Sequence, residues 1–271
     1  MSREDVIERP APPPDLTLSY GPSSDNVVDV RLPASTSPAP LVVVVHGGFW
    51  RTGFDRAHAG PQSAALAEEG YVVATVEYRR VGRVGSGWPH TLDDAALFAD
   101  TVPTLLAGSL PGRIELGRTV FVGHSAGGHL VTWLAARHVL PASSRWATAN
   151  PLAGAVAALA GVVDLALAEQ LGLGGHATAA LLGGSPSEQP DRYAQADPAR
   201  LLPTGVRTVL VQGLDDVVVP PAVSRSFAAA ARVARDDVRL HELGGADHYD
   251  VIDPTSAAWP AVLAAVGEAL R

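Results

Sequence analysis

The sequence predicts an α/β fold in which a mostly parallel central sheet is flanked by helices. Short apolar, β-branched runs alternate with alanine-rich stretches of helical length, which is typical of βα units around a parallel sheet. The run at residues 41–45 is uninterruptedly apolar, as expected of a central strand covered on both faces. With 271 residues, 47% of them hydrophobic, the chain can bury a large core, and we expect one domain over residues 1–271.

The elements follow from these runs in chain order. Four prolines within residues 8–15 fix φ and cannot donate to a helix or sheet, so residues 1–25 are expected to form a proline-rich arm. About fifty residues separate the fifth and sixth predicted strands, longer than an ordinary connection, and a small cap is expected at about 164–204. Pro103 should kink or end the second helix. The predicted strands are 27–32, 41–45, 71–77, 119–122, 155–159, 208–212 and 238–243, and the predicted helices are 57–69, 92–106, 126–138, 222–234 and 256–270.

Composition excludes several classes of protein. Cysteine is absent, which removes disulfides, a thiolate nucleophile and zinc sites built on thiolates. The chain has no run of about 18 apolar residues, so we expect no membrane-spanning helix. A formal charge of −8 disfavours nucleic acid and anionic membranes as partners. The charged first residues do not resemble a signal peptide, and a cytoplasmic location is expected. The oligomeric state stays open.

A G-x-S-x-G pattern at residues 123–127 carries the first sign of chemistry. It directly follows an apolar strand and directly precedes an alanine-rich helix, the context of a nucleophile elbow. The flanking glycines permit a tight turn, and the helix aims its positive N-terminus at the reaction. A serine in an ordinary turn is the simpler alternative, but the strand-turn-helix context favours Ser125 as a nucleophile.

A serine hydroxyl needs a base and an orienting acid, which in this arrangement follow it in the order Asp, His. Asp215 and Asp216 lie in the turn after the predicted strand at 208–212. His248 ends a glycine-rich loop after the next strand and is the expected base. Asp164 also follows a strand, although an aspartate before a helix is more often an N-cap.

The H-G-G-F-W run at residues 46–50 ends the central apolar strand. Its glycines allow backbone N–H groups to turn toward a developing oxyanion, so Gly48 or Phe49 is expected to act with Ala126 as an oxyanion hole. Aromatic side chains beside such a loop can form pocket walls or plain core, and both alternatives are kept for Phe49 and Trp50. The residues expected to contact substrate are Gly47, Trp50 and His124.

Neither a metal nor a cofactor is expected. His46 and His129 belong to no metal-binding motif such as H-E-x-x-H, and buried histidines are usually hydrogen-bonded scaffold. Acyl transfer by a serine, a histidine and an aspartate needs no cofactor. The remaining histidines are expected on the surface or in the scaffold, namely His58, His90, His138, His176 and His241.

Together these motifs resemble the α/β-hydrolases, and H-G-G-F-W with G-H-S-A-G-G-H is similar to their esterase and kynurenine formamidase (arylformamidase) branch. The resemblance runs from about residue 27 onward. It implies that the residue three positions after the strand-ending Gly213 is the acid, which is Asp216. The sequence departs from the pattern at two places. Gln212 stands where many relatives have histidine before the glycine, and E-Y-R-R at 77–80 replaces the D-Y-R of hormone-sensitive-lipase-like esterases. Both departures concern the substrate and leave the serine, aspartate and histidine unchanged.

The expected activity is two-step hydrolysis of a small carboxylic ester through an acyl-enzyme. The resemblance adds an aryl-formamide or similar amide as the alternative substrate. A ligand-binding or non-hydrolytic protein on the same scaffold is the alternative from another class.

Overall fold

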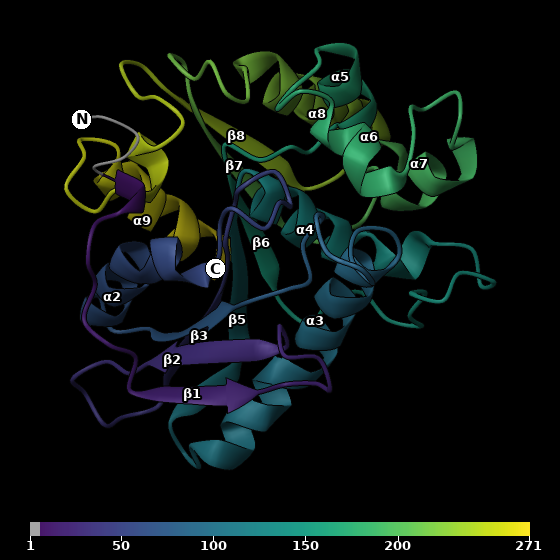
Figure 1. Ribbon diagram of the computed structural model, residues 1–271. Coiled ribbons are helices and arrows are strands. Elements are labelled where there is room, and N and C mark those ends of the chain that lie inside the picture. Colours follow the sequence, from purple (N-terminus) through teal and green to yellow (C-terminus); the bar gives the residue numbers. More distant parts are fainter. Residues whose placement is uncertain (1–5) are drawn as a thin grey trace.

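One eight-stranded sheet forms the centre of the computed structural model, which describes residues 6–271 (Figure 1). The strand order is β1-β2-β4-β3-β5-β6-β7-β8. Strands β4 to β8 pair in parallel along this order, whereas β1 with β2 and β2 with β4 are antiparallel. The strands are β1 Leu16–Ser19, β2 Val27–Arg31, β3 Ala39–Val45, β4 Val72–Val76, β5 Ile114–His124, β6 Ala155–Leu159, β7 Thr208–Gly213 and β8 Val238–Leu243.

Helices cover both faces of the sheet (Figure 1). Because successive strand side chains point to opposite faces, Val42 and Val44 pack with α2 and α9, while Val43 and Val45 pack with α3, α4 and α8. Within residues 6–271, no helix combines the length and apolar character needed to cross a bilayer. The helices are α2 Gly60–Glu68, α3 His90–Ser109, α4 Ala126–Ala135, α5 Leu165–Gln170, α6 Ala177–Leu182, α7 Pro190–Ala196, α8 Pro221–Ala234 and α9 Trp259–Ala269, with short 3-10 turns η1 Arg56–Ala59, η2 Arg137–Val139, η3 Pro198–Arg200 and η4 Asp250–Ile252.

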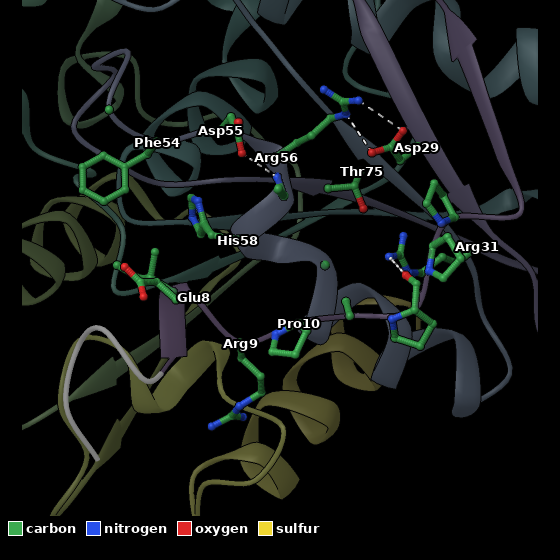
Figure 2. A pocket seen from close by; sticks show the side chains of 18 of the residues that line it. Glu8, Arg9, Pro10, Asp29, Arg31, Phe54, Asp55, Arg56, His58 and Thr75 are labelled. Atoms are coloured by element: carbon green, nitrogen blue, oxygen red, sulfur yellow. Dashed lines mark hydrogen bonds and ion pairs between the residues drawn. The ribbon is translucent and has the colours of Figure 1, made fainter.

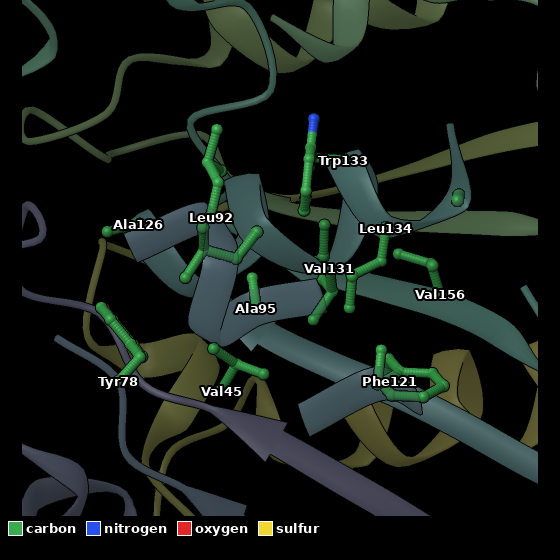
Figure 3. Packing of buried hydrophobic residues seen from close by; sticks show 14 of the residues in the cluster. Val45, Tyr78, Leu92, Ala95, Phe121, Ala126, Val131, Trp133, Leu134 and Val156 are labelled. Carbon is green, nitrogen blue, oxygen red and sulfur yellow. The ribbon is translucent and has the colours of Figure 1, made fainter. Parts of the chain in front are cut away.

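The core beneath α3 and α4 is closely filled by large side chains (Figure 3). Leu92 of α3, Trp133 of α4 and Phe121 of β5 are at most 1% exposed. This packing fixes α4 over the carboxyl ends of β3 and β5, which is the edge where the motif residues gather.

The predicted fold class is confirmed, and the differences are local. The arm predicted over residues 1–25 contains strand β1, whose Leu16 pairs with Val30 of β2. Helix α3 continues past Pro103 to Ser109. Proline removes one helical hydrogen bond, and the buried Val102 and Leu106 on either side keep the helix on the core.

The segment between β6 and β7, where a cap is expected, contains α5, α6, α7 and η3. Its helices lie together at one end of the molecule (Figure 1). Two buried side chains of α4 bind its carbonyls: His129 Nε2 lies 2.9 Å from Ala196 O, and Trp133 Nε1 donates to Gln195 O over 2.8 Å. The segment is therefore tied to the same helix that begins at Ser125.

Candidate active site

Ser125 lies between β5 and α4 in a strained backbone conformation, with φ 53° and ψ −115°. Three hydrogen bonds hold it there. Its N–H donates to Leu159 O over 2.9 Å, and its carbonyl accepts from the N–H groups of His129 and Val162, each over 3.1 Å. A non-glycine residue persists in this region only where its surroundings over-determine it, so the turn is built to present the serine side chain.

The glycines beside Ser125 are required by close backbone contact. A Cβ added at Gly123 would lie 2.2 Å from Gly127 O. One added at Gly127 would lie 2.1 Å from Val45 O, at the end of the neighbouring strand. Real Cβ atoms do not approach so closely, so the G-x-S-x-G pattern follows from how tightly α4 packs on β3 and β5.

His248 and Asp216 are paired at the ends of adjacent loops. Nδ1 of His248 donates to Asp216 Oδ2 over 2.7 Å, and both residues are 3% exposed. The other carboxylate oxygen, Oδ1, accepts from the N–H groups of Val218 and Val219, each over 2.8 Å. These bonds fix the carboxylate against Nδ1 of His248.

The other two candidate acids, Asp215 and Asp164, make different contacts. Asp215 is exposed to solvent and its N–H donates to Ala246 O. Asp164 caps α5 by accepting from the N–H of Leu167, and it also accepts from the hydroxyl of Ser226. The N-cap reading of Asp164 is thus confirmed.

Gln212, a departure from the pattern of the resembled branch, binds Asp216. Its Nε2 donates to Asp216 Oδ2 over 3.2 Å and also reaches Val219 O at 3.2 Å. Its Oε1 accepts from the hydroxyl of Ser224 over 2.7 Å. The signal in the sequence was its place at a strand end four residues before Asp216, where an amide can reach the carboxylate.

His124 binds the backbone of the loop that carries His248. Its Nε2 donates to the backbone carbonyl of His248 over 2.9 Å, and the two ring centroids are 4.6 Å apart. Burial, with the nearby His248 ring, lowers the pKa of His124 well below its usual value. The ring is therefore neutral, with its proton on Nε2. Nδ1 faces Gly47, where an added Cβ would lie 2.8 Å from it.

A cavity of about 260 Å³ lies against Ser125 and His248. Gly48, Phe49 and His124, all predicted site residues, line it as well, whereas Gly47, Trp50 and Ala126 do not. The other walls come from the arm, the loop before η1 with η1 itself, the segment between β6 and β7, and the chain that follows β7 and β8. These further lining residues are Ile7, Arg51, Phe54, His58, Gly174, Val218, Tyr249 and Ile252.

The loop after β3 has three consecutive residues in the left-handed region, with φ of 108° at Gly48, 49° at Phe49 and 57° at Trp50. Within residues 6–271, the N–H groups of Gly48, Phe49 and Ala126 donate to no protein carbonyl. Unpaired N–H groups beside a serine in a cavity can bind an oxygen that gains negative charge.

His46 anchors the start of this loop. Its Nε2 lies 2.8 Å from Glu77 Oε1, its Nδ1 lies 2.8 Å from Gly47 O, and its ring stacks on Tyr78 with centroids 4.5 Å apart. Burial opposes ionisation of Glu77, but the His46 partner and Arg80 outweigh it and lower the pKa of Glu77 to about 2. The E-Y-R-R departure thus supplies a buried carboxylate that fixes the loop.

Trp50 is placed differently from the prediction of substrate contact. It is fully buried, and its ring meets His129 edge to face with centroids 5.2 Å apart. The left-handed backbone at Trp50 turns this side chain into the core, whereas Phe49 lies at the cavity.

In the part of the chain that the structure describes, no group of three or more His, Asp or Glu side chains is placed to bind a metal.

Comparisons with known proteins identify the family of this chain. The BD-FAE family model matches residues 28–230. A probable isoprenylcysteine alpha-carbonyl methylesterase ICME from Oryza sativa subsp. japonica is 26% identical over 87% of this chain and 58% of its own length. A kynurenine formamidase from Danio rerio is 28% identical over 42% of this chain and 36% of its own length. The chain therefore spans less than two thirds of these relatives.

A solved structure described as a truncated form of carbohydrate esterase from gut microbiota superposes with a TM-score of 0.79. It is 18% identical and covers 96% of this chain and 99% of its own, which shows a shared fold. The family match extends over more than half of the chain and includes the predicted nucleophile and acid. The chain belongs to the BD-FAE family and has the α/β-hydrolase fold.

Proposed function

We propose that this chain hydrolyses small carboxylic esters, with Ser125 as nucleophile, His248 as general base and Asp216 as the acid that orients the histidine. The observation that supports this most is that Ser125 and His248 line one cavity while Asp216 binds Nδ1 of His248. That bond fixes the tautomer in which Nε2 can accept the serine proton.

In the proposed reaction, Nε2 of His248 takes the proton from the Ser125 hydroxyl as the oxygen attacks the ester carbonyl. The resulting oxyanion accepts hydrogen bonds from the N–H of Ala126 and from that of Gly48 or Phe49, each worth about 3 kcal/mol in the transition state. The imidazolium then gives its proton to the departing alcohol. Water, deprotonated by the same histidine, hydrolyses the acyl-enzyme and releases the carboxylic acid.

The cavity supports a compact substrate. Its volume of about 260 Å³ is small, and Phe49, Phe54 and Ile252 supply apolar surface. We infer that the segment at 164–204 acts as the cap, because Gly174 lines the cavity and its carbonyl accepts from Arg51 Nη2 over 2.6 Å. The similarity to a kynurenine formamidase over 42% of the chain keeps an aryl-formamide as the second candidate substrate.

Labelling with a fluorophosphonate tests the nucleophile, because an activated serine reacts quickly with this probe. We expect intact mass to show one adduct on the wild type and on Ser185→Ala, an exposed serine outside the cavity, and none on Ser125→Ala. Rates on p-nitrophenyl acetate and N-formylkynurenine then separate the two substrates. Folded wild type without an adduct would contradict the proposal and favour the ligand-binding alternative.

A further inference from the structure

The N-terminal arm reaches the candidate active site from the far end of the sequence. Val6 is 6% exposed and packs in the cluster that contains Val251 and Ile252 of η4, just after His248. The next residue, Ile7, lines the cavity that holds Ser125 and His248. One side chain of the arm is therefore a wall of the site, and the residue before it packs in the core without lining the cavity.

Two polar contacts fix the arm beyond Ile7. Arg9 pairs with Asp253 through both terminal nitrogens of its guanidinium, with Nη2 donating to Oδ2 over 3.0 Å and Nη1 to Oδ1. Asp253 is 1% exposed; burial opposes its ionisation, but Arg9 and Thr255 outweigh burial and lower its pKa. Farther along, Arg31 Nη2 donates to Pro12 O over 2.5 Å. The arm is thus held at both ends of residues 9–12.

Under the arm lies a second cavity of about 510 Å³ (Figure 2). More charged residues line it than line the first, among them Arg56, which donates from Nε to Asp29 Oδ2 over 2.7 Å. Figure 2 shows Phe54 and His58 toward one end of this cavity and Asp29 and Arg31 toward the other. It is larger than the first cavity and has no predicted role.

Of the residues that the structure describes, three line both cavities: Ile7, Phe54 and His58. They are therefore the partition between the two spaces. Burial, with the nearby His46, lowers the pKa of His58 to about 3, so its ring is neutral and adds no charge to this wall. Phe54 and His58 belong to the loop and turn before α2, and their rings meet edge to face with centroids 6.1 Å apart. Ile7 is the member supplied by the arm.

We propose that Ile7 determines substrate length: its side chain closes the catalytic cavity toward the second cavity, so only compact esters fit. The inference rests on the proposed function. Shortening Ile7 joins the two spaces, and a longer acyl chain or alcohol can then extend under the arm. Because one methylene in an apolar pocket changes specificity measurably, removing most of this side chain should have a large effect.

The test compares Ile7→Ala with Val6→Ala, the adjacent residue on the same arm, which is buried but lines neither cavity. Each variant is assayed for kcat/KM on p-nitrophenyl esters from acetate to octanoate, and on acetates of alcohols from methanol to octanol. We expect Ile7→Ala to raise the ratio of long to short substrate at least about tenfold in one of the two series. Val6→Ala should leave both ratios within about twofold of the wild type.

A third variant, Ile7→Phe, should lower the same ratio by filling the opening. Equal ratios for Ile7→Ala and Val6→Ala in both series would overturn the inference and leave Ile7 as ordinary packing. Fluorophosphonate labelling of Ser125 in each variant keeps the two proposals apart. A wild type that is neither labelled nor active would refute the proposed function, whereas labelled variants with unchanged ratios would refute the role of Ile7 alone.

Discussion

Gln212 donates a hydrogen bond to Asp216 over 3.2 Å, and the accepting atom, Oδ2, is the same oxygen that receives Nδ1 of His248. The carboxylate is thus held by an amide and an imidazole on one oxygen and by two backbone N–H groups on the other. Ser224 in turn orients the amide. A residue that does not line the cavity thus helps to hold the carboxylate that binds His248.

Gln212→Leu removes the amide donor while keeping a side chain of similar size. A hydrogen bond to a charged group contributes about 1.5–3 kcal/mol, so kcat should fall about ten- to a hundredfold while KM stays unchanged. Steady-state kinetics on p-nitrophenyl acetate, with thermal unfolding as a check on folding, measure this. Ser224→Ala should show a smaller loss in the same direction. An unchanged kcat in folded Gln212→Leu would show that the amide does not orient the acid.

Asp216→Asn should lower kcat by about four orders of magnitude, because an amide facing Nδ1 favours the wrong imidazole tautomer. The matched control is Asp215→Asn, one residue away and exposed, which should stay within about twofold of the wild type. Initial rates on p-nitrophenyl acetate compare them. If Asp215→Asn were the more damaging change, the acid would have to be reassigned.

His124→Phe keeps a planar ring but removes the Nε2 donor to the carbonyl of His248. We expect kcat to fall about tenfold, since a loosened histidine loop samples the reactive geometry less often. His124→Gln retains an N–H donor and should recover part of the loss. The pH profiles of kcat/KM show whether the remaining base still titrates as in the wild type. Equal losses in the two variants would make His124 a packing residue.

Acid should destabilise the fold through His129. Burial lowers its pKa to about 4, so between this value and its ordinary 6.5 the unfolded chain binds the proton more readily than the folded chain. The stability it contributes is complete above pH 6.5 and is lost as the pH falls. Between pH 7 and pH 5 this loss amounts to about 2 kcal/mol.

Urea unfolding of the wild type and His129→Asn at both pH values tests this prediction. The variant should have a lower free energy of unfolding at pH 7. Between pH 7 and pH 5, its free energy of unfolding should fall by about 2 kcal/mol less than that of the wild type. An equal change in the free energy of unfolding between the two pH values for both proteins would mean that His129 already accepts a proton in the folded protein.

Much of the sheet could be predicted because its strands are short, apolar and bounded by turn residues. Residues 155–159 and 238–243 form β6 and β8 with the predicted limits. Strand β1 could not be predicted in this way, because Leu16–Ser19 has four residues at an edge and exists through its pairing with β2. The continuation of α3 past Pro103 likewise depends on buried contacts that no local pattern contains.

The same distinction between local and long-range signals applies to the residues of the candidate site. Ser125, Asp216 and His248 could be selected because each follows a strand in a short motif, and the structure brings Ser125 and His248 to one cavity and Asp216 to His248. Ile7 and His58 carry no local signal, because their importance comes from contacts with residues far along the chain. Trp50 could not be assigned between pocket and core because the turn at Phe49 decides which ring faces inward.

The ion pair between Arg9 and Asp253 joins positions 244 residues apart in the sequence. During synthesis, this ion pair therefore cannot form until Asp253 has left the ribosome. Closing so long a loop costs entropy that is recovered only after the sheet has brought both ends together. The wall at Ile7 should accordingly be among the last parts of the catalytic cavity to form, after the elbow at Ser125 has folded.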